Sequence, residues 1–188
     1  MNITREPPEV DVKKLLASAQ LPTVDITPEH MEHFFAAWAD SSLVGVVGVE
    51  LHDSVALLRS LAVVASKRGS GVGSALLDRV EQYAAEKGVR SLFILTTTAE
   101  SYFKKRGYSH LLREAAPEAI QKTAEFTSIC PANSAFMVKH MPRSLNVEVQ
   151  QVSGRMIDLR RGFEAMSFPR SGVQFVGDPI AFLLRQPL

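Results

Sequence analysis

The chain has 188 residues, of which 46% are apolar and 22% are charged, and its formal net charge is +1. This composition is that of an ordinary globular protein with one full hydrophobic core. The sequence shows no basic run, so a nucleic-acid partner has no electrostatic support, and we expect a small-molecule or protein partner.

The number of cysteines and the length of the apolar runs predict whether the protein binds a structural metal and whether it spans a membrane. The single cysteine, Cys130, has no partner for a disulfide or a structural zinc site, so we expect no metal and a buried, inert thiol. Segment 1–11 is polar, and no stretch reaches the roughly 20 apolar residues that span a bilayer. A soluble cytoplasmic protein without membrane contact is the simplest expectation.

Two helices are expected in the first forty residues. Pro7-Pro8 can open a helix that runs to about Gln20 and ends before Leu21-Pro22. Thr27-Pro28 is typical of an N-cap followed by proline in the first turn. The apolar residues that follow have helical spacing and predict a core-facing stripe: Met31, Phe34, Phe35 and Trp38.

The middle of the chain predicts a hairpin, a loop, a helix and a strand. Segments 43–51 and 55–64 read as antiparallel strands around a turn. After a glycine-rich loop, apolar residues recur every four positions from Val72 to Ala84, and Gly88 ends this helix. Segment 91–96 is a continuous apolar strand, which should lie parallel to the strand before the loop.

The remaining segments predict a short helix at 99–106 closed by Gly107, a strand at 108–113, a helix at 117–126 and a strand at 135–140. The sheet is therefore expected to be mixed, with parallel strands at its centre. Met141-Pro142 marks a boundary between a domain, 1–142, and an extension, 143–188. We expect the extension to pack on the core or on a second subunit of a homodimer.

The loop 68–73 is a candidate phosphate site. Its glycines let the backbone approach a ligand, the following helix offers free N–H groups, and Arg68 adds a cation. A P-loop would need lysine where Ser74 follows Gly73. A dinucleotide fingerprint would need glycine at Ser74 and an acidic residue near 96–98. A glycine-rich turn without a ligand is a further alternative.

The pattern Arg68-x-x-Gly71-x-Gly73 after Leu61-Ala62-Val63 resembles the pyrophosphate loop of GNAT acetyltransferases. Segment 99–108 resembles a later helix of that family with its closing Gly-Tyr. The resemblance covers roughly 43–141 and implies the α/β GNAT fold, a mixed central sheet with a splayed pair of parallel strands flanked by helices. Segments 57–63, 95–100 and 123–131 further resemble the acetyltransferases associated with bacterial arsenic-resistance operons.

The resemblance implies acetyl-CoA as cosubstrate and an amine as acceptor. Backbone groups of Leu61 and Val63 would pair with the pantetheine arm. The pyrophosphate would be lined by Arg68, Gly69, Gly71, Gly73 and Ser74. Catalysis would rest on positioning and on oxyanion stabilisation by strand N–H groups.

The chain departs from the family at both usual acid and base positions. Segment 57–60 lacks the glutamate of many members, so Glu50 on the preceding strand is the candidate base through water, unless it faces solvent or pairs with Arg59. The acid tyrosine is replaced by Phe103. Its neighbour Tyr102, about 100° away around a helix, is the alternative acid, and water is another.

Arg59 lies on the strand beside the expected reaction centre and suggests an acceptor that carries an anion, with Arg113 as a second candidate. Structural salt bridges are the alternative for both. The sequence thus predicts an N-acetyltransferase for a small anionic acceptor, such as an amino acid or an arsenic or phosphorus analogue of one. A protein lysine or N-terminal acetyltransferase and a non-catalytic acyl-CoA sensor remain as alternatives.

Overall fold

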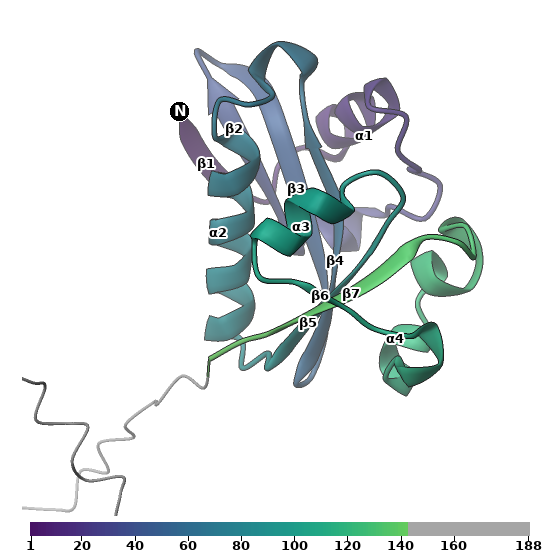
Figure 1. Cartoon of the computed structure of the whole chain (residues 1–188). Helices are drawn as coiled ribbons and strands as arrows, with labels where there is room; N and C mark the ends of the chain where they lie inside the picture. The colour runs from purple at the N-terminus through teal and green to yellow at the C-terminus, as the bar shows by residue number, and fades with distance from the viewer. Residues whose placement is uncertain (143–188) are drawn as a thin grey trace, which may run out of the picture. The chain divides into compact units, whose positions relative to one another are not determined.

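The structure is a computed structural model and describes residues 1–142. Within this range the strands form one sheet in the order β1-β2-β3-β4-β5-β7-β6 (Figure 1). Only β4 and β5 are parallel neighbours, and every other pair is antiparallel. The strands are β1 Asn2–Arg5, β2 Phe34–Ala39, β3 Ser42–His52, β4 Val55–Val63, β5 Ser91–Thr96, β6 Ser109–His110 and β7 Ala135–His140.

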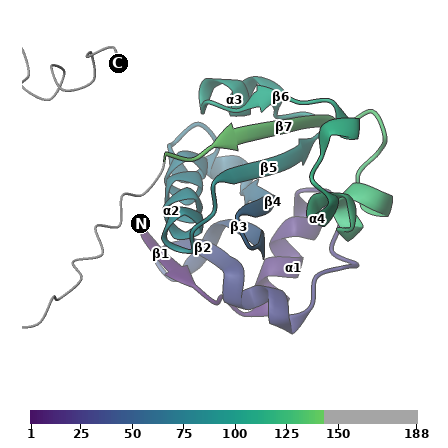
Figure 2. The ribbon, with the colours of Figure 1, turned by 90° about the horizontal axis from the view of Figure 1, so that it is seen from below.

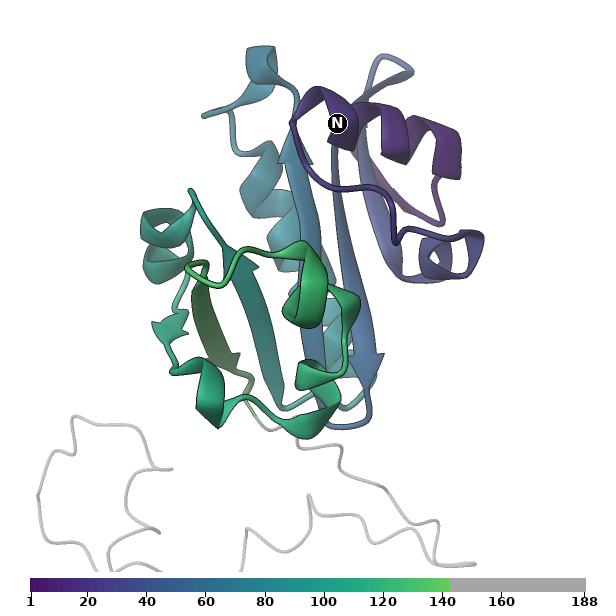
Figure 3. The same ribbon diagram turned by 90° about the vertical axis from the view of Figure 1, so that its right-hand side faces the viewer.

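Helices cover both faces of the sheet (Figure 2). Helix α2, Val72–Glu86, packs on one face, and α3, Glu100–Lys105, contributes Phe103 to the same apolar cluster. Helix α1, Glu9–Ser18, and α4, Glu118–Gln121, lie on the other face. Figure 3 looks onto this second face, with α1 over one end of the sheet and the α4 segment over the other.

Short helical turns complete the domain. They are the 3-10 turns Pro28–His33, Ala65–Lys67 and Arg113–Ala115, and a π-helical turn, Glu125–Ile129, that follows α4. None of the helices within residues 1–142 is long and apolar enough to cross a membrane. The same residues contain no group of three or more histidine, cysteine or carboxylate side chains arranged to hold a metal ion.

Most of the central predictions are confirmed. The hairpin is β3 and β4, the glycine loop leads into α2, and Gly88 follows the end of that helix with φ 84°. Strand β5 pairs parallel with β4, and Gly107, with φ 86°, follows the C-cap Arg106 of α3. These elements could be predicted because in each one the apolar residues follow a clear pattern and a glycine or a turn marks its end.

The second predicted helix is wrong. Thr27 and Pro28 begin only a 3-10 turn, after which Phe34–Ala39 form strand β2. Both faces of β2 are covered: Phe35 and Ala37 pack into the α2 cluster, whereas Phe34 and Ala36 pack into the α1 cluster. A strand buried on both faces is apolar throughout, and such a run also satisfies helical spacing.

Two predictions near the carboxyl end of the domain need smaller corrections. The strand expected at 108–113 is only Ser109–His110. The helix expected at 117–126 stops after Gln121, where the Thr123 hydroxyl donates to the Ile120 carbonyl at 2.8 Å and competes with the helical pattern. The predicted extension, 143–188, lies outside the described residues.

Candidate active site

A gap between β4 and β5 defines the site. The two strands pair from Val55 with Ser91 to Leu58 with Ile94, and no further pairs follow. Yet β4 continues to Val63 and β5 to Thr96. The strands therefore separate at their carboxyl ends, and unpaired backbone groups of both face the space between them.

A β-bulge bends β4 where the gap begins. Val46 of β3 faces Ala62, but Gly48 faces Arg59, so Ser60 and Leu61 together oppose the single residue Val47. Ser60 has φ 57°, a left-handed conformation that costs serine of order 1–3 kcal/mol. Bulges re-aim backbone and side chains and are frequent beside active sites.

A cavity of about 420 Å³ occupies the gap. One wall is the bulge at Ser60 and Leu61, and the opposite wall is the end of β5 with the residues that follow, 94–99. Three other parts of the chain close it: residues 20–22 after α1, Phe103 on α3, and the segment 125–134, which contributes Glu125, Ile129, Cys130, Pro131 and Ser134.

The glycine loop lies at the start of α2. Gly69 and Gly71 have φ 75° and 89°, and a Cβ at either position would meet nothing within 4 Å. Helix α2 has no acidic residue in its first turn and no side-chain cap. The backbone N–H groups of this turn are thus open to an anion at the positive end of the helix dipole. This arrangement fits the pyrophosphate of coenzyme A.

Arg68 and Ser70 shape this loop through backbone contacts. The Arg68 Nε donates to the Val63 carbonyl at 3.1 Å, and the Ser70 hydroxyl donates to the Lys67 carbonyl at 2.6 Å. Val63 itself pairs with Gly45 of β3, whereas Leu61 lines the cavity. Their predicted contacts with the pantetheine arm stay predictions, as do those of Ser74 in the first turn of α2.

Tyr102 points toward the start of α2. Its hydroxyl lies 3.7 Å from the position of a Cβ on Gly73, and it is buried without a hydrogen-bond partner among the described residues. Phe103, one residue later, lines the cavity instead. An unpaired buried hydroxyl beside the glycine loop is one that a bound diphosphate or amide could satisfy. The role of Tyr102 as general acid stays a prediction.

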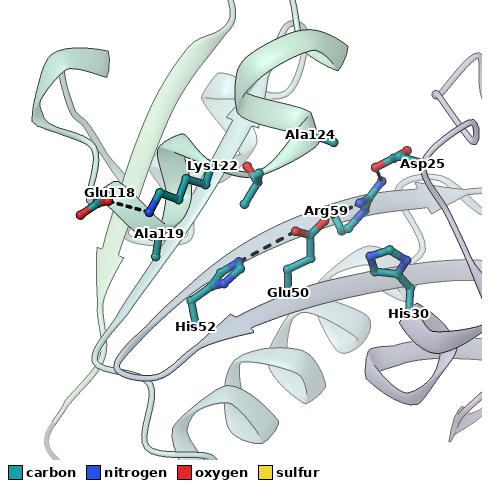
Figure 4. A pocket seen from close by; sticks show the side chains of 10 residues that line it. Asp25, His30, Glu50, His52, Arg59, Glu118, Ala119, Lys122 and Ala124 are labelled. Carbon is teal, nitrogen blue, oxygen red and sulfur yellow. Dashed lines mark hydrogen bonds and ion pairs between the residues drawn. The ribbon is translucent and has the colours of Figure 1, made fainter.

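Arg59 is the centre of a buried charge cluster (Figure 4). Its side chain is 1% exposed and forms ion pairs with Asp25, Glu50 and Glu125 at N–O distances of 2.6, 2.5 and 3.2 Å. Asp25 follows α1, Glu50 belongs to β3, and Glu125 begins the π-helical turn. The guanidinium of Arg59 thus connects the segment after α1, strand β3 and the π-helical turn. Three carboxylates share its positive charge.

Burial shifts the pKa of Glu125 and of the neighbouring Cys130. Burial raises the pKa of Glu125 to about 7; the carboxylates of Glu50 and Asp25 add to the rise, and the charge of Arg59 opposes it. Burial also raises the pKa of the Cys130 thiol to about 11, so this cysteine is a neutral thiol at pH 7. A neutral thiol is a poor nucleophile and metal ligand, but Cys130 is only partly buried, whereas the sequence predicted a buried cysteine.

A second cavity, of about 570 Å³, lies beside the first on the α4 side. It is lined by Asp25, His30, Glu50, His52, Arg59, Glu118, Ala119, Lys122, Thr123 and Ala124 (Figure 4). Arg59 lines both cavities, so its ion pairs form part of the wall between them. Glu50 lines only the second cavity, and His52 lies 3.9 Å from its Oε2.

Arg113 does not line either cavity. Its Nη2 donates to the Phe126 carbonyl at 2.7 Å, and its guanidinium lies 4.3 Å from the centre of the Phe126 ring. In this position it stabilises the segment that carries Glu125. Its predicted contact with the acceptor would require a change in these bonds.

The sequence interpretation missed Asp25 and Glu125. Both lie in segments whose local pattern gave no reason to single out one carboxylate, the first after a helix-breaking proline and the second inside an expected helix. A buried arginine beside the reaction centre was the only signal, because it requires carboxylate partners from elsewhere in the chain.

Comparison with known proteins is consistent with this geometry. The family model described as "Acetyltransferase (GNAT) family" matches residues 3–108, more than half of the chain. The uncharacterized N-acetyltransferase CT2212 of Chlorobaculum tepidum is 31% identical over 108 residues, which are 57% of this chain and 67% of that protein. An amino-acid acetyltransferase of Ralstonia nicotianae is 37% identical over 70 residues, which are 37% of this chain but only 16% of that protein.

Solved structures share the fold at low sequence identity. N-acetylglutamate synthase from Neisseria gonorrhoeae, complexed with coenzyme A and L-arginine, has a TM-score of 0.65 at 21% identity and covers 76% of this chain and 33% of that one. Rv2747 from Mycobacterium tuberculosis, in complex with CoA, has a TM-score of 0.63 at 19% identity and covers 76% of this chain and 100% of that one.

Proposed function

This chain belongs to the acetyltransferase (GNAT) family and is an acetyl-CoA-dependent N-acetyltransferase; from that premise we propose that its acceptor is the amine of a small molecule of the amino-acid class. The observation that carries this proposal is the cavity between β4 and β5, which is lined both by the bulge at Ser60 and Leu61 and by Arg59 and Glu125. One cavity therefore offers both a place for a thioester and charged groups for an acceptor.

The donor side of the site would be held largely by backbone. The open N–H groups at the start of α2, with Arg68, Gly69, Gly71, Gly73 and Ser74 around them, would bind the pyrophosphate of acetyl-CoA. Backbone groups of Leu61 and Val63 would hold the pantetheine arm along β4. Amides freed at the bulge could stabilise the oxyanion that forms on the thioester carbonyl.

The acceptor side is dominated by carboxylates. Asp25, Glu50 and Glu125 surround a single guanidinium, so the cluster carries an excess of negative charge when they are ionised. Such an excess attracts an ammonium group, the protonated form of an amine acceptor. The names of the partial relatives, amino-acid acetyltransferases, support an acceptor of this class.

The acid group of such an acceptor still needs a cation. We propose Arg59 for it, as the sequence suggested, through exchange of one of the three carboxylates that now hold its guanidinium. Glu125, at 3.2 Å the most distant of the three, is the one most readily exchanged. Analogues with an arsenic or phosphorus oxyacid in place of the carboxylate belong in the same acceptor class.

The test is acceptor-dependent release of thiol from acetyl-CoA. The panel contains the amino acids, their arsenic and phosphorus oxyacid analogues, simple amines without an acid group and lysine-containing peptides. We expect at least one amino acid or analogue to accelerate release, and its decarboxylated amine to do so less. Faster release with peptides than with any small acceptor would contradict the proposal.

A further inference from the structure

The proposed acetyl transfer requires a group that takes a proton from the acceptor amine. Resting on that proposed function, we propose that Glu125 is this general base and that Glu50 is a positioning residue which holds Arg59. The sequence suggested Glu50 on β3 as the base, whereas we assign this role to Glu125 in the π-helical turn.

The lining of the two cavities separates the glutamates. Glu125 lines the cavity between β4 and β5 together with Ser60 and Leu61, where the thioester carbonyl is expected. Glu50 lines only the neighbouring cavity on the α4 side. A base must reach the proton that it abstracts directly or through one water, and only Glu125 shares a cavity with the reaction centre.

The contacts of the two carboxylates differ in the same sense. Glu50 uses Oε1 for Arg59 at 2.5 Å, and its Oε2 lies 3.9 Å from His52. Glu125 has Oε1 3.2 Å from Arg59, and its Oε2 accepts only a weak bond from the Cys130 thiol at 3.9 Å. Each glutamate thus has one oxygen without a strong partner, and the difference lies in the ion pair with Arg59, which is longer for Glu125 than for Glu50.

The surroundings of Glu125 make it a usable base near neutral pH. The charged and titratable groups around it are Arg59 on β4, Glu50 on β3, Asp25 after α1, and Cys130 at the end of its own turn. Burial, opposed by the guanidinium, gives it a pKa of about 7. A base is most effective when its pKa lies close to the working pH.

The backbone around Glu125 is also unusual. Residues 125–129 form a π-helical turn in which the Cys130 N–H donates to the Glu125 carbonyl at 3.0 Å. Such turns are rare and occur frequently at functional sites. Arg113 ties the turn down by its bond to the Phe126 carbonyl.

Glu125 takes one proton from the ammonium of the acceptor, and the freed nitrogen lone pair forms a C–N bond to the thioester carbonyl. The bulge amides hold the oxyanion until the C–S bond breaks. The second proton lost from nitrogen goes to the thiolate, either directly or through water, so the products are an amide and a thiol, and Glu125 returns its proton to solvent.

The first test compares three glutamate-to-glutamine variants in the thiol-release assay with the best acceptor. Glu125→Gln should lower kcat/KM for the acceptor at pH 7 by about 100-fold or more and remove the rise in rate between pH 6 and 8. Glu50→Gln should raise the acceptor KM and keep that rise. Glu86→Gln, which removes an exposed carboxylate at the end of α2 and away from both cavities, should behave as the unmodified chain. All three should bind acetyl-CoA with unchanged affinity.

A rate for Glu125→Gln within threefold of the unmodified chain, or loss of the pH dependence in Glu50→Gln alone, would overturn the assignment. A second measurement is independent of any acceptor: ¹³C NMR of protein labelled at the glutamate carboxyl carbons. One resonance should titrate near pH 7 and be absent from Glu125→Gln. If no such resonance exists, the base assignment fails even where acetyl transfer is observed; if it exists but no acceptor is found, only the proposed function fails.

Discussion

The glycine loop and the Arg59 cluster, which we propose for the cosubstrate and the acceptor respectively, are built in opposite ways. The loop is exposed, its ligand groups are backbone amides, and its first helical turn carries no acid. The cluster is buried, and its groups are side chains whose charges depend on one another. A substitution at the loop should therefore change one ligand's affinity, whereas a substitution in the cluster should change stability, pH dependence and acceptor binding together.

The largest effect is expected for Arg59→Ala, because it leaves the buried carboxylate of Glu125 and the half-buried carboxylates of Asp25 and Glu50 without a counterion. Removing one partner of a buried ion pair costs about 3–5 kcal/mol of unfolding free energy, and denaturant unfolding at pH 7 would measure it. In the folded protein the acceptor KM should rise more than the acetyl-CoA KM. Part of the lost stability should return at pH 5, where carboxylates begin to protonate; a loss independent of pH would point to packing instead.

Gly73→Asp tests the glycine loop, where we expect a change in the affinity for acetyl-CoA alone. A carboxylate in the first turn of α2 suits the helix dipole, so folding should be retained, but it would repel the diphosphate. We expect acetyl-CoA affinity to fall by about 100-fold in calorimetry, since like charges a few ångströms apart near a surface interact by several kcal/mol.

Gly73→Ala is the matched control for size. Its Cβ would lie 3.6 Å from Val63 Cγ2 and 3.7 Å from the Tyr102 hydroxyl, which are ordinary contacts. Its affinity for acetyl-CoA should therefore lie close to that of the unmodified chain. Equal affinity in the alanine and aspartate variants would show that the diphosphate binds elsewhere.

The pH dependence of stability tests the cluster in the absence of any ligand. The pKa of Glu125 is about 7 in the folded chain, against 4.5 for the ordinary side chain, so folding favours its protonated form. Its contribution to stability is present below about pH 4.5 and is lost as the pH rises through 7. The difference in unfolding free energy between the unmodified chain and Glu125→Gln should change by on the order of 3 kcal/mol over this window. A constant difference would mean that Glu125 titrates normally.

The smallest effect is expected for Tyr102→Phe. The Tyr102 hydroxyl is buried without a partner among residues 1–142, so its removal should raise stability by up to about 1 kcal/mol. Saturating acetyl-CoA should cancel this gain if the hydroxyl binds the cosubstrate. A fall in kcat beyond tenfold without a change in acetyl-CoA affinity would instead support Tyr102 as the acid.

The parts of the fold that the sequence predicted share one property. The hairpin, the glycine loop, α2 and β5 are each specified by local pattern, and the parallel pairing of β4 and β5 follows from their order along the chain. Strand β2 could not be identified in this way, because its burial on both faces gives the same apolar run as a helix. The helix expected at 117–126 is interrupted after Gln121, where the Thr123 hydroxyl bonds to the Ile120 carbonyl, and helical backbone resumes in the π-helical turn Glu125–Ile129; a pattern of apolar residues does not predict such a break.

The candidate site also has one part that local sequence predicts and one part that only the tertiary structure brings together. The backbone amides of the glycine loop were predictable because glycine spacing and a helix start describe them almost completely. The carboxylates around Arg59 were not, since Asp25 and Glu125 are 100 positions apart in the chain and only the fold brings both to one guanidinium. Charge balance in a buried site is a property of the tertiary structure.

The bulge in β4 has a consequence for how a gap in a sheet can arise. Leu57 faces the α4 side and Leu58 the α2 side, whereas beyond the bulge Leu61 and Val63 pack toward α2 and Ala62 toward α1. If Ser60 were deleted, Arg59 and every later side chain would keep its present face in a regular alternation. Ser60 therefore leaves the alternation of core side chains along β4 unchanged. The bulge that it adds lies beside the gap between β4 and β5. One extra residue is therefore enough to add a bulge to a strand without rearranging its core side chains.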